Sequence, residues 1–170
     1  MPATTDTTFL VNHTGGPIVL RIQGKANYLN CAPVGHFFER MIEEGYREFY
    51  VDFAECNGMD STFLGLLASA ALQLKEADED GRLVLVRLNE RNLELVQNVG
   101  LHNLMIIEDT EPGVNLGTSQ PLAEDPGKEK VVAANSKMVL KSHKALVEID
   151  ESNKKQFQDV ISFLRNQDDS

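Results

Sequence analysis

The chain has 170 residues, of which 42% are hydrophobic, so it can form one domain with an appendage and fill a core of its own. Its formal net charge of -10 argues against a nucleic-acid-binding protein, because a strongly acidic surface cannot neutralise phosphates. Residues 1–120 carry 8 Lys and Arg against 17 Asp and Glu, whereas residues 121–170 carry 8 against 9. An acidic main part beside a nearly neutral tail is typical of a soluble protein and is compatible with protein partners.

The cysteines and the hydropathy pattern predict a compartment. Only Cys31 and Cys56 occur, and neither has the spacing of a metal site. No cationic leader precedes an apolar stretch, and no apolar run approaches the ~18 residues of a membrane span. We therefore expect a reduced, cytoplasmic protein without membrane insertion.

The first predicted elements are two strands and a helix. Residues 8–13 and 16–24 have strand patterns, and the Thr-Gly-Gly at 14–16 predicts a hairpin between them. Residues 32–45 then place apolar side chains at helical spacing and end at Gly45.

Strand and helix patterns continue to alternate. Residues 47–56 form a buried-strand pattern, and the apolar stretch from Ser61 to Asp80 predicts a helix that Gly81 ends. The alternating, β-branched residues 82–88 predict a further strand.

A short helix and a last strand complete the pattern. Residues 91–105 predict the helix, with Gly100 just beyond its end, and residues 105–109 predict the strand. The resulting order, ββαβαβαβ, predicts an α/β domain over residues 1–109. We expect a single mixed β-sheet with its helices mainly on one face.

The composition changes after this domain. Residues 110–130 are rich in Pro and Gly, which predicts a linker. Residues 131–170 predict a C-terminal pair of amphipathic helices, which cannot bury their apolar faces alone and should pack on the main domain or on a second copy. The two faces consist of Met138, Ser142, Ala145, Leu146 and Ile149, and of Phe157, Val160, Ile161 and Leu164.

Motifs for enzymatic chemistry are absent from the sequence. There is no phosphate-binding loop, no G-x-G-x-x-G after a strand, no H-E-x-x-H and no paired C-x-x-C. Cys31 and His36 lie five positions apart without a residue to orient them, and a cysteine-phosphatase arginine is missing. The histidines, His13, His36, His102 and His143, are scattered. We expect neither an enzyme nor a cofactor or metal.

The turn before the second predicted helix holds Asp60, Ser61 and Thr62, any one of which could cap the helix. Redundant capping is the simplest interpretation. We also expect Ser61 to lie on an exposed strand-to-helix turn, where a kinase could reach its hydroxyl. The helix N-terminus would tolerate a phosphate there, while the added charge would change any docking surface.

The stretch VDFAECNGMDSTFLGLL resembles the strand, turn and helix of the STAS family, the sulfate-transporter and anti-sigma-factor-antagonist domain. Residues 59–65 fit its turn, and the resemblance covers about residues 8–109. It implies that Ser61 is phosphorylated by a partner that is both a serine kinase and an anti-sigma factor. The unphosphorylated antagonist would bind that partner, and a PP2C-type phosphatase would reset the switch. Thr62 is a weaker second acceptor.

The same resemblance implies a partner-docking set, Asp60, Met59, Asn27, Phe63 and Leu64. Two of its members depart from the family pattern. Phe63 stands where antagonists usually carry a small residue, and Asn27 stands where they tend to carry an aspartate.

Three interpretations remain open. The first is the phospho-switched antagonist, and the second is a STAS scaffold in a signalling or membrane-associated complex, in which Ser61 only caps a helix. A small enzyme is the third and least favoured. The C-terminal helices could be a docking arm, a dimerising element or a lid.

Overall fold

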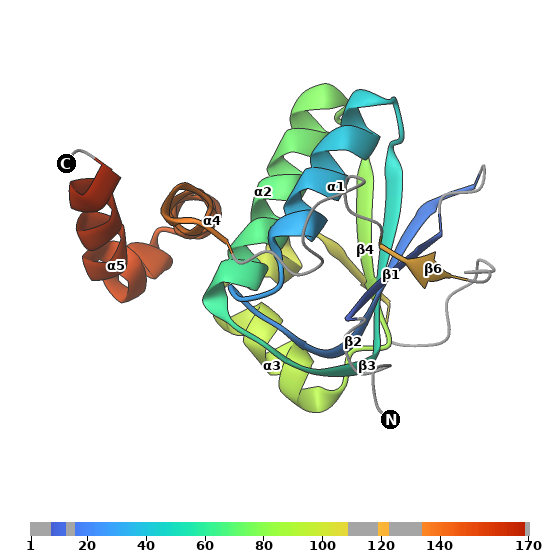
Figure 1. Ribbon diagram of the computed structural model, residues 1–170, viewed down its shortest axis with the longest axis horizontal. Helices are drawn as coiled ribbons and strands as arrows, with labels where there is room; N and C mark the ends of the chain where they lie inside the picture. The colour runs from blue at the N-terminus through green and yellow to red at the C-terminus, as the bar shows by residue number, and fades with distance from the viewer. Residues whose placement is uncertain (1–7, 13–15, 109–118, 123–133, 169–170) are drawn as a thin grey trace.

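The computed structural model describes residues 8–12, 16–108, 119–122 and 134–168, and Figure 1 labels its helices and strands. The strands are β1 (Phe9–Asn12), β2 (Ile18–Ala26), β3 (Glu48–Met59), β4 (Arg82–Val86), β5 (Ile106–Glu108) and β6 (Gln120–Pro121). The helices are α1 (Ala32–Glu43), α2 (Ser61–Ala77), α3 (Glu90–Asn98), the 3-10 turn η2 (Leu101–Asn103), α4 (Ser136–Ile149) and α5 (Ser152–Asp168).

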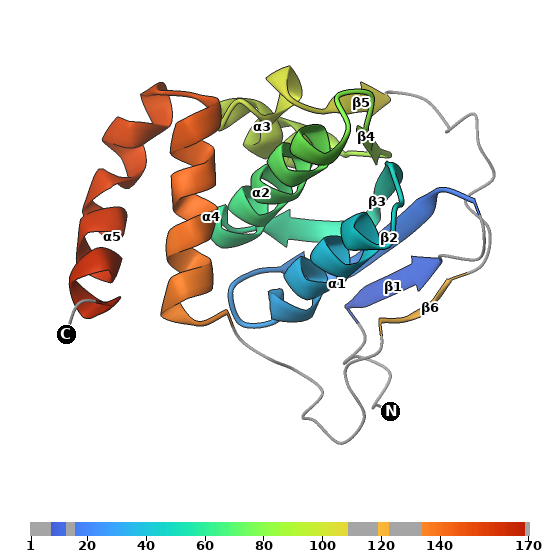
Figure 2. The ribbon, with the colours of Figure 1, turned by 90° about the horizontal axis from the view of Figure 1, so that it is seen from above.

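The strands form a mixed, six-stranded sheet in the order β5-β4-β3-β2-β1-β6. β1 pairs antiparallel with both β2 and β6, whereas β2, β3, β4 and β5 pair in parallel. Because these four strands advance in one direction across the sheet, right-handed crossovers place α1, α2 and α3 on one face. The predicted fold class, including the helices on one face, is confirmed (Figure 2).

The main core lies between the sheet and this helical layer. Its largest fully buried side chains include four phenylalanines, from α1, β3 and α2. They are Phe37, Phe49, Phe53 and Phe63. The opposite face of the sheet buries a smaller cluster, Val19, Tyr50, Val84 and Val86.

Several element boundaries differ from the sequence prediction. α2 ends at Ala77 instead of Asp80, because Asp78 is extended, with φ of -161°. Gly81 lies in the following turn, where an added Cβ would come within 2.6 Å of the Leu74 side chain. The helix predicted at 91–105 stops at Asn98, and the left-handed Gly100 redirects the chain into η2.

Two other predictions fall partly outside the described residues. The turn of the predicted hairpin includes residues 13–15, which are not described, although β1 and β2 do pair antiparallel. Within the segment predicted as a linker, β6 adds a short strand to the sheet edge at β1.

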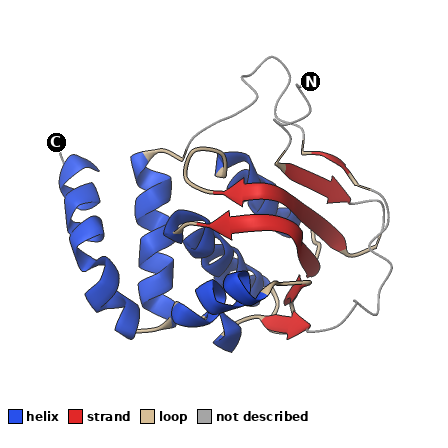
Figure 3. Cartoon of the chain, turned by 90° about the horizontal axis from the view of Figure 1, so that it is seen from below, coloured by secondary structure: helices blue, strands red, loops and turns tan. Residues whose placement is uncertain are grey.

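α4 and α5 form a separate outer layer, which we call the C-terminal arm. α4 packs across α2, and α5 packs on the far side of α4 from the sheet (Figures 1 and 3). The C-terminal helices therefore pack on the main domain of their own chain. In α5, Phe157 and Leu164 are buried as expected, but Val160 is 40% exposed, so the predicted apolar face is narrower than the sequence pattern indicates.

Candidate functional site

Asp60 organises the turn between β3 and α2. One carboxylate oxygen, Oδ1, accepts a hydrogen bond from the Phe63 backbone N–H at 2.9 Å and thereby caps α2. The other, Oδ2, accepts from the Tyr28 N–H at 2.9 Å, in the loop between β2 and α1. The Asp60 N–H itself donates to the Ala26 carbonyl at 3.2 Å. One side chain thus caps the helix and joins the two loops beside it.

Replacing Asp60 with alanine is expected to lower the free energy of unfolding by about 2 kcal/mol, because both carboxylate hydrogen bonds are lost. Asp60→Asn keeps an oxygen for the cap but turns an NH₂ group toward the Tyr28 donor, so it should cost about 1 kcal/mol. Urea denaturation of the full chain measures both values. If both variants lose the same free energy of unfolding, the Asp60 carboxylate does not both cap α2 and hold the loop at Tyr28.

Ser61 is the first residue of α2 but does not cap it. Its hydroxyl lies 2.8 Å from Nε2 of His143, which belongs to α4. Nδ1 of His143 lies 2.7 Å from the Val139 carbonyl, which can only accept, so Nδ1 carries the proton. In the neutral ring, Nε2 then accepts and the Ser61 hydroxyl donates. The interpretation of Ser61 as only a helix cap is therefore wrong.

The exposure of Ser61 also differs from expectation. The sequence predicts an exposed turn, but Ser61 is only partly exposed because α4 packs against it. His143 is itself 3% exposed, and its ring contacts Phe157 of α5 edge-on, with centroids 5.2 Å apart. Both helices of the arm thus hold the imidazole over the hydroxyl.

Sequence reasoning did not assign His143 a role. The available signal was its position on α4, three residues before Leu146, which is fully buried. That spacing predicts a side chain facing the same way as the apolar face. It does not indicate which residue lies opposite, because Ser61 is 82 positions away in the sequence.

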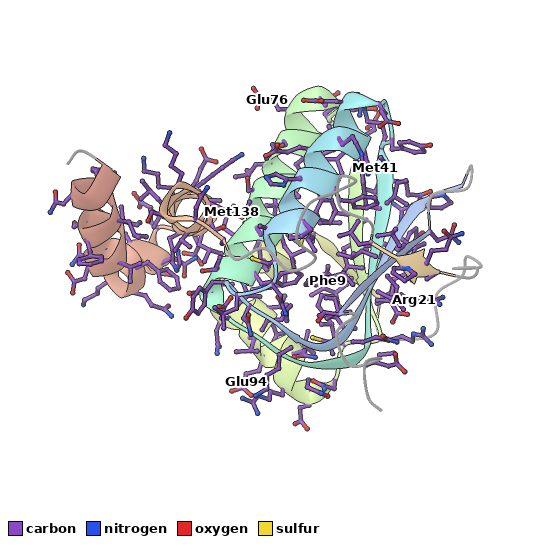
Figure 4. The ribbon with its side chains drawn as sticks, in the orientation of Figure 1. Phe9, Arg21, Met41, Glu76, Glu94 and Met138 are labelled. Atoms are coloured by element: carbon purple, nitrogen blue, oxygen red, sulfur yellow. The ribbon has the colours of Figure 1, made fainter. Side chains whose placement is uncertain are left out.

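The remaining residues of the predicted site divide into a buried and a more accessible group. Thr62, Phe63 and Leu64 are 4%, 0% and 3% exposed, respectively. The Phe63 ring stacks on Phe9, with centroids 6.0 Å apart, in the space between sheet and helices where Figure 4 labels Phe9. The bulky side chain that departs from the family pattern therefore points into the core and does not itself cover Ser61.

Met59 and Asn27 are partly exposed and lie near Asp60, at the ends of two paired strands. The Asn27 side-chain oxygen accepts from the Leu29 N–H at 2.9 Å and so shapes the loop. The next two residues, Tyr28 and Leu29, are 49% and 53% exposed. This loop presents apolar surface beside the Asp60 turn.

Neither cysteine has the environment of a nucleophile. Burial, with a smaller contribution from the Asp60 charge, raises the pKa of Cys31 to about 12, so its thiol stays protonated at neutral pH. Burial also raises the pKa of Cys56. His36 is exposed while Cys31 is buried, so the two do not form a pair. His13 lies outside the described residues.

Within the described segments there is no cluster of three or more side chains that could hold a metal ion. In the same part of the chain, no helix combines the length and hydrophobicity needed to span a membrane.

Residues 9–108 match the family model described as "Mlab, STAS domain". Among solved structures, the chain is similar to the anti-sigma factor antagonist SpoIIAA in its unphosphorylated form, at 20% identity and a TM-score of 0.49, over 61% of this chain and 89% of that one. It is also similar to the Bacillus cell fate determinant SpoIIAA in the phosphorylated form, at 21% identity and a TM-score of 0.48, over 59% and 91%. No curated protein is significantly similar to the sequence.

Proposed function

Because this chain belongs to the STAS family, we propose that it is an anti-sigma-factor antagonist, a protein-interaction domain switched by phosphorylation of Ser61. In its unphosphorylated form it binds a protein that is both serine kinase and anti-sigma factor. Phosphorylation abolishes that binding, and a PP2C-type phosphatase restores it. The protein acts in the cytoplasm and is not an enzyme.

The observation that carries this proposal is the division of labour at the α2 N-terminus. Asp60 supplies the cap, so the helix does not need the Ser61 hydroxyl for its own backbone. A phosphate at Ser61 would add about -1.5 to -2 charges next to Asp60. The helix dipole and free N–H groups favour an anion at this end, so the fold survives while the surface changes.

In the proposed reaction, Ser61 Oγ forms a bond to the γ-phosphorus of ATP held by the kinase, the bond to ADP breaks, and the hydroxyl proton passes to a base of the kinase. Thr62 is a weaker acceptor, since its side chain is 4% exposed. Met59, Asp60 and Asn27 form the accessible part of the docking set. Phe63 and Leu64 support it from the core.

We expect a Ser61→Ala bait to retain an ATP-dependent serine kinase from native cell lysate and a Ser61→Asp bait to lose it, because the carboxylate imitates the charge of the phosphate. Affinity capture read by mass spectrometry measures this. Ser152→Asp is the matched control: it makes the same change at the first residue of α5, outside the family match, and should retain the kinase.

A second candidate function is a STAS scaffold that is not phosphorylated. The partial burial of Ser61 and its hydrogen bond to His143 favour this alternative. If the Ser61→Ala and Ser61→Asp baits retain the same partners, the scaffold replaces the switch.

A further inference from the structure

We propose that the C-terminal arm is a lid, which in its closed position hides the Ser61 hydroxyl and the N-terminal half of α2 and must move away before a partner can engage them. The inference rests on the proposed function, in that it concerns the same hydroxyl. The arm lies outside the family match, which ends at residue 108.

α4 approaches the backbone of α2 closely at Gly65, one helical turn beyond Ser61. An added Cβ on Gly65 would lie 2.2 Å from the Ser142 backbone oxygen and 2.5 Å from its carbonyl carbon. Backbone atoms cannot yield as the end of a flexible side chain can. The absence of a side chain at position 65 therefore permits α4 to lie on α2, and any larger residue there opposes closure.

The second closing contact is the pair Ser61–His143. Nε2 of His143 lies 2.8 Å from Oγ of Ser61. This oxygen is the atom that would attack a phosphoryl group. The proton on Nδ1 is directed to the Val139 carbonyl, which leaves Nε2 as an acceptor for the Ser61 hydroxyl. A phosphorylated Ser61 has no hydroxyl proton to donate, so the hydrogen bond to the neutral imidazole is lost when the serine is modified.

The far end of the lid is held by Asn153, which is 1% exposed. Its Nδ2 donates to the Val99 carbonyl of the domain and to the Leu146 carbonyl of α4, both at 2.8 Å. Nearby, an added Cβ on Gly100 would lie 2.8 Å from the Asp150 carboxylate. The lid thus rests on the domain at the middle of α4 and at its C-terminal end.

The surface between lid and domain is suited to a contact that opens. α4 carries Lys137, Lys141 and Lys144 against one acid, Glu148, while the domain beneath is acidic. The Lys141 ammonium lies 3.3 Å from the Glu39 carboxylate, and both side chains are about half exposed. Two adjoining surface hollows border the contact with α2, and Met138, labelled in Figure 4, lines one of them. Exposed charge pairs contribute little to stability, so closure depends mainly on buried contacts. These are the contacts at Gly65, His143 and Asn153 together with the apolar side chains of Ala145, Leu146 and Phe157, which join the main core.

Hydroxyl-radical footprinting of the full chain, read by mass spectrometry, tests the lid without any kinase. In the wild type, His143 should be oxidised at least about tenfold more slowly than His36 and His102, which are exposed. Gly65→Ala should raise His143 oxidation by about one power of ten, because overpacking shifts the equilibrium toward the open lid while alanine favours helix α2.

Gly35→Ala is the matched control. Its Cβ would meet the end of the flexible Met138 side chain of α4 at 3.2 Å, so the lid can stay closed and His143 oxidation should change less than about twofold. Ser142→Leu, which crowds the same contact from the lid side, should open it as Gly65→Ala does. Oxidation of the core residue Phe53 separates opening from unfolding and should stay low in all variants.

The proposal that the arm is a lid is wrong if wild-type His143 is oxidised as fast as His36 and His102. The proposal is also wrong if Gly65→Ala and Ser142→Leu both leave His143 oxidation unchanged, or raise it only together with the oxidation of Phe53. Phosphate on Ser61, measured in cells, should be higher in Gly65→Ala than in Gly35→Ala. Absence of phosphate from both would refute the proposed function and leave the footprinting result standing.

Discussion

Replacement of Phe63 by alanine is expected to lower the free energy of unfolding by about 3–5 kcal/mol, which is the usual cost of removing a buried phenyl ring. The side chain is fully buried and stacks on Phe9 between the sheet and α2. Removing it loses this contact and leaves a cavity that the surrounding strands can only partly fill. Urea denaturation of the full chain measures the difference.

Phe163→Ala is the control for this prediction. That ring is 62% exposed on α5, so its removal should change the free energy of unfolding by less than about 0.5 kcal/mol. A loss below about 1 kcal/mol for Phe63→Ala would contradict its assignment to the core. It would instead support the expectation that Phe63 contacts a partner.

Arg87→Met should cost about 3 kcal/mol, because it removes one partner from an ion pair whose acid is buried. Asp52 in the middle of β3 is 2% exposed, and its Oδ1 accepts from Arg87 Nε at 3.0 Å while Oδ2 accepts from Arg87 as well. Arg21 Nε lies 3.3 Å from the same Oδ2. Methionine keeps the aliphatic part of the arginine but removes one of the two positive charges that stabilise the buried Asp52 carboxylate.

Arg82→Met is the matched control, made at the start of β4. The partner of Arg82 is Glu48, at 2.8 Å, but their side chains are 44% and 37% exposed. Water solvates both charges, so the loss should stay below about 1 kcal/mol. Thermal or urea denaturation of the two variants side by side compares the pairs. Similar losses would mean that burial of Asp52 does not determine the strength of its pair.

Phe63 and Asp52 differ in how much of their environment can be predicted from the sequence. Phe63 lies in an apolar run at helical spacing, so its burial follows from the pattern around it. Asp52 also lies in a buried-strand pattern, but its partner Arg87 is 35 positions away. Nothing in the sequence near Asp52 indicates which cation compensates it.

The same distinction applies to the candidate site. The sequence placed Asp60, Ser61 and Thr62 together at a helix start, because capping depends on neighbours within three residues. It did not predict that Asp60 alone provides the cap and also holds the loop at Tyr28. That second hydrogen bond depends on β2 and β3 lying side by side, which is a property of the sheet.

The sequence prediction of the end of α2 was wrong. Helical spacing and Gly81 predict a helix to Asp80, yet Asp78 leaves the helical conformation three residues before the glycine. The Asp78 carboxylate accepts from the Asp80 N–H at 2.9 Å in this turn, and Gly81 lies close to Leu74, whose side chain an added Cβ would meet at 2.6 Å. A glycine that marks a close contact and one that ends a helix look alike in the sequence.

By itself the sequence determined the order of strands and helices through residue 108, the one-sided helical layer and the polar turn with Ser61. Periodicity and capping act over short distances, and right-handed crossovers apply to all such folds. Only the tertiary structure decided that α4 lies on α2, with His143 on the Ser61 hydroxyl and Ser142 against Gly65. Such contacts join segments about 80 residues apart through shape and hydrogen-bond geometry, and no local pattern encodes them.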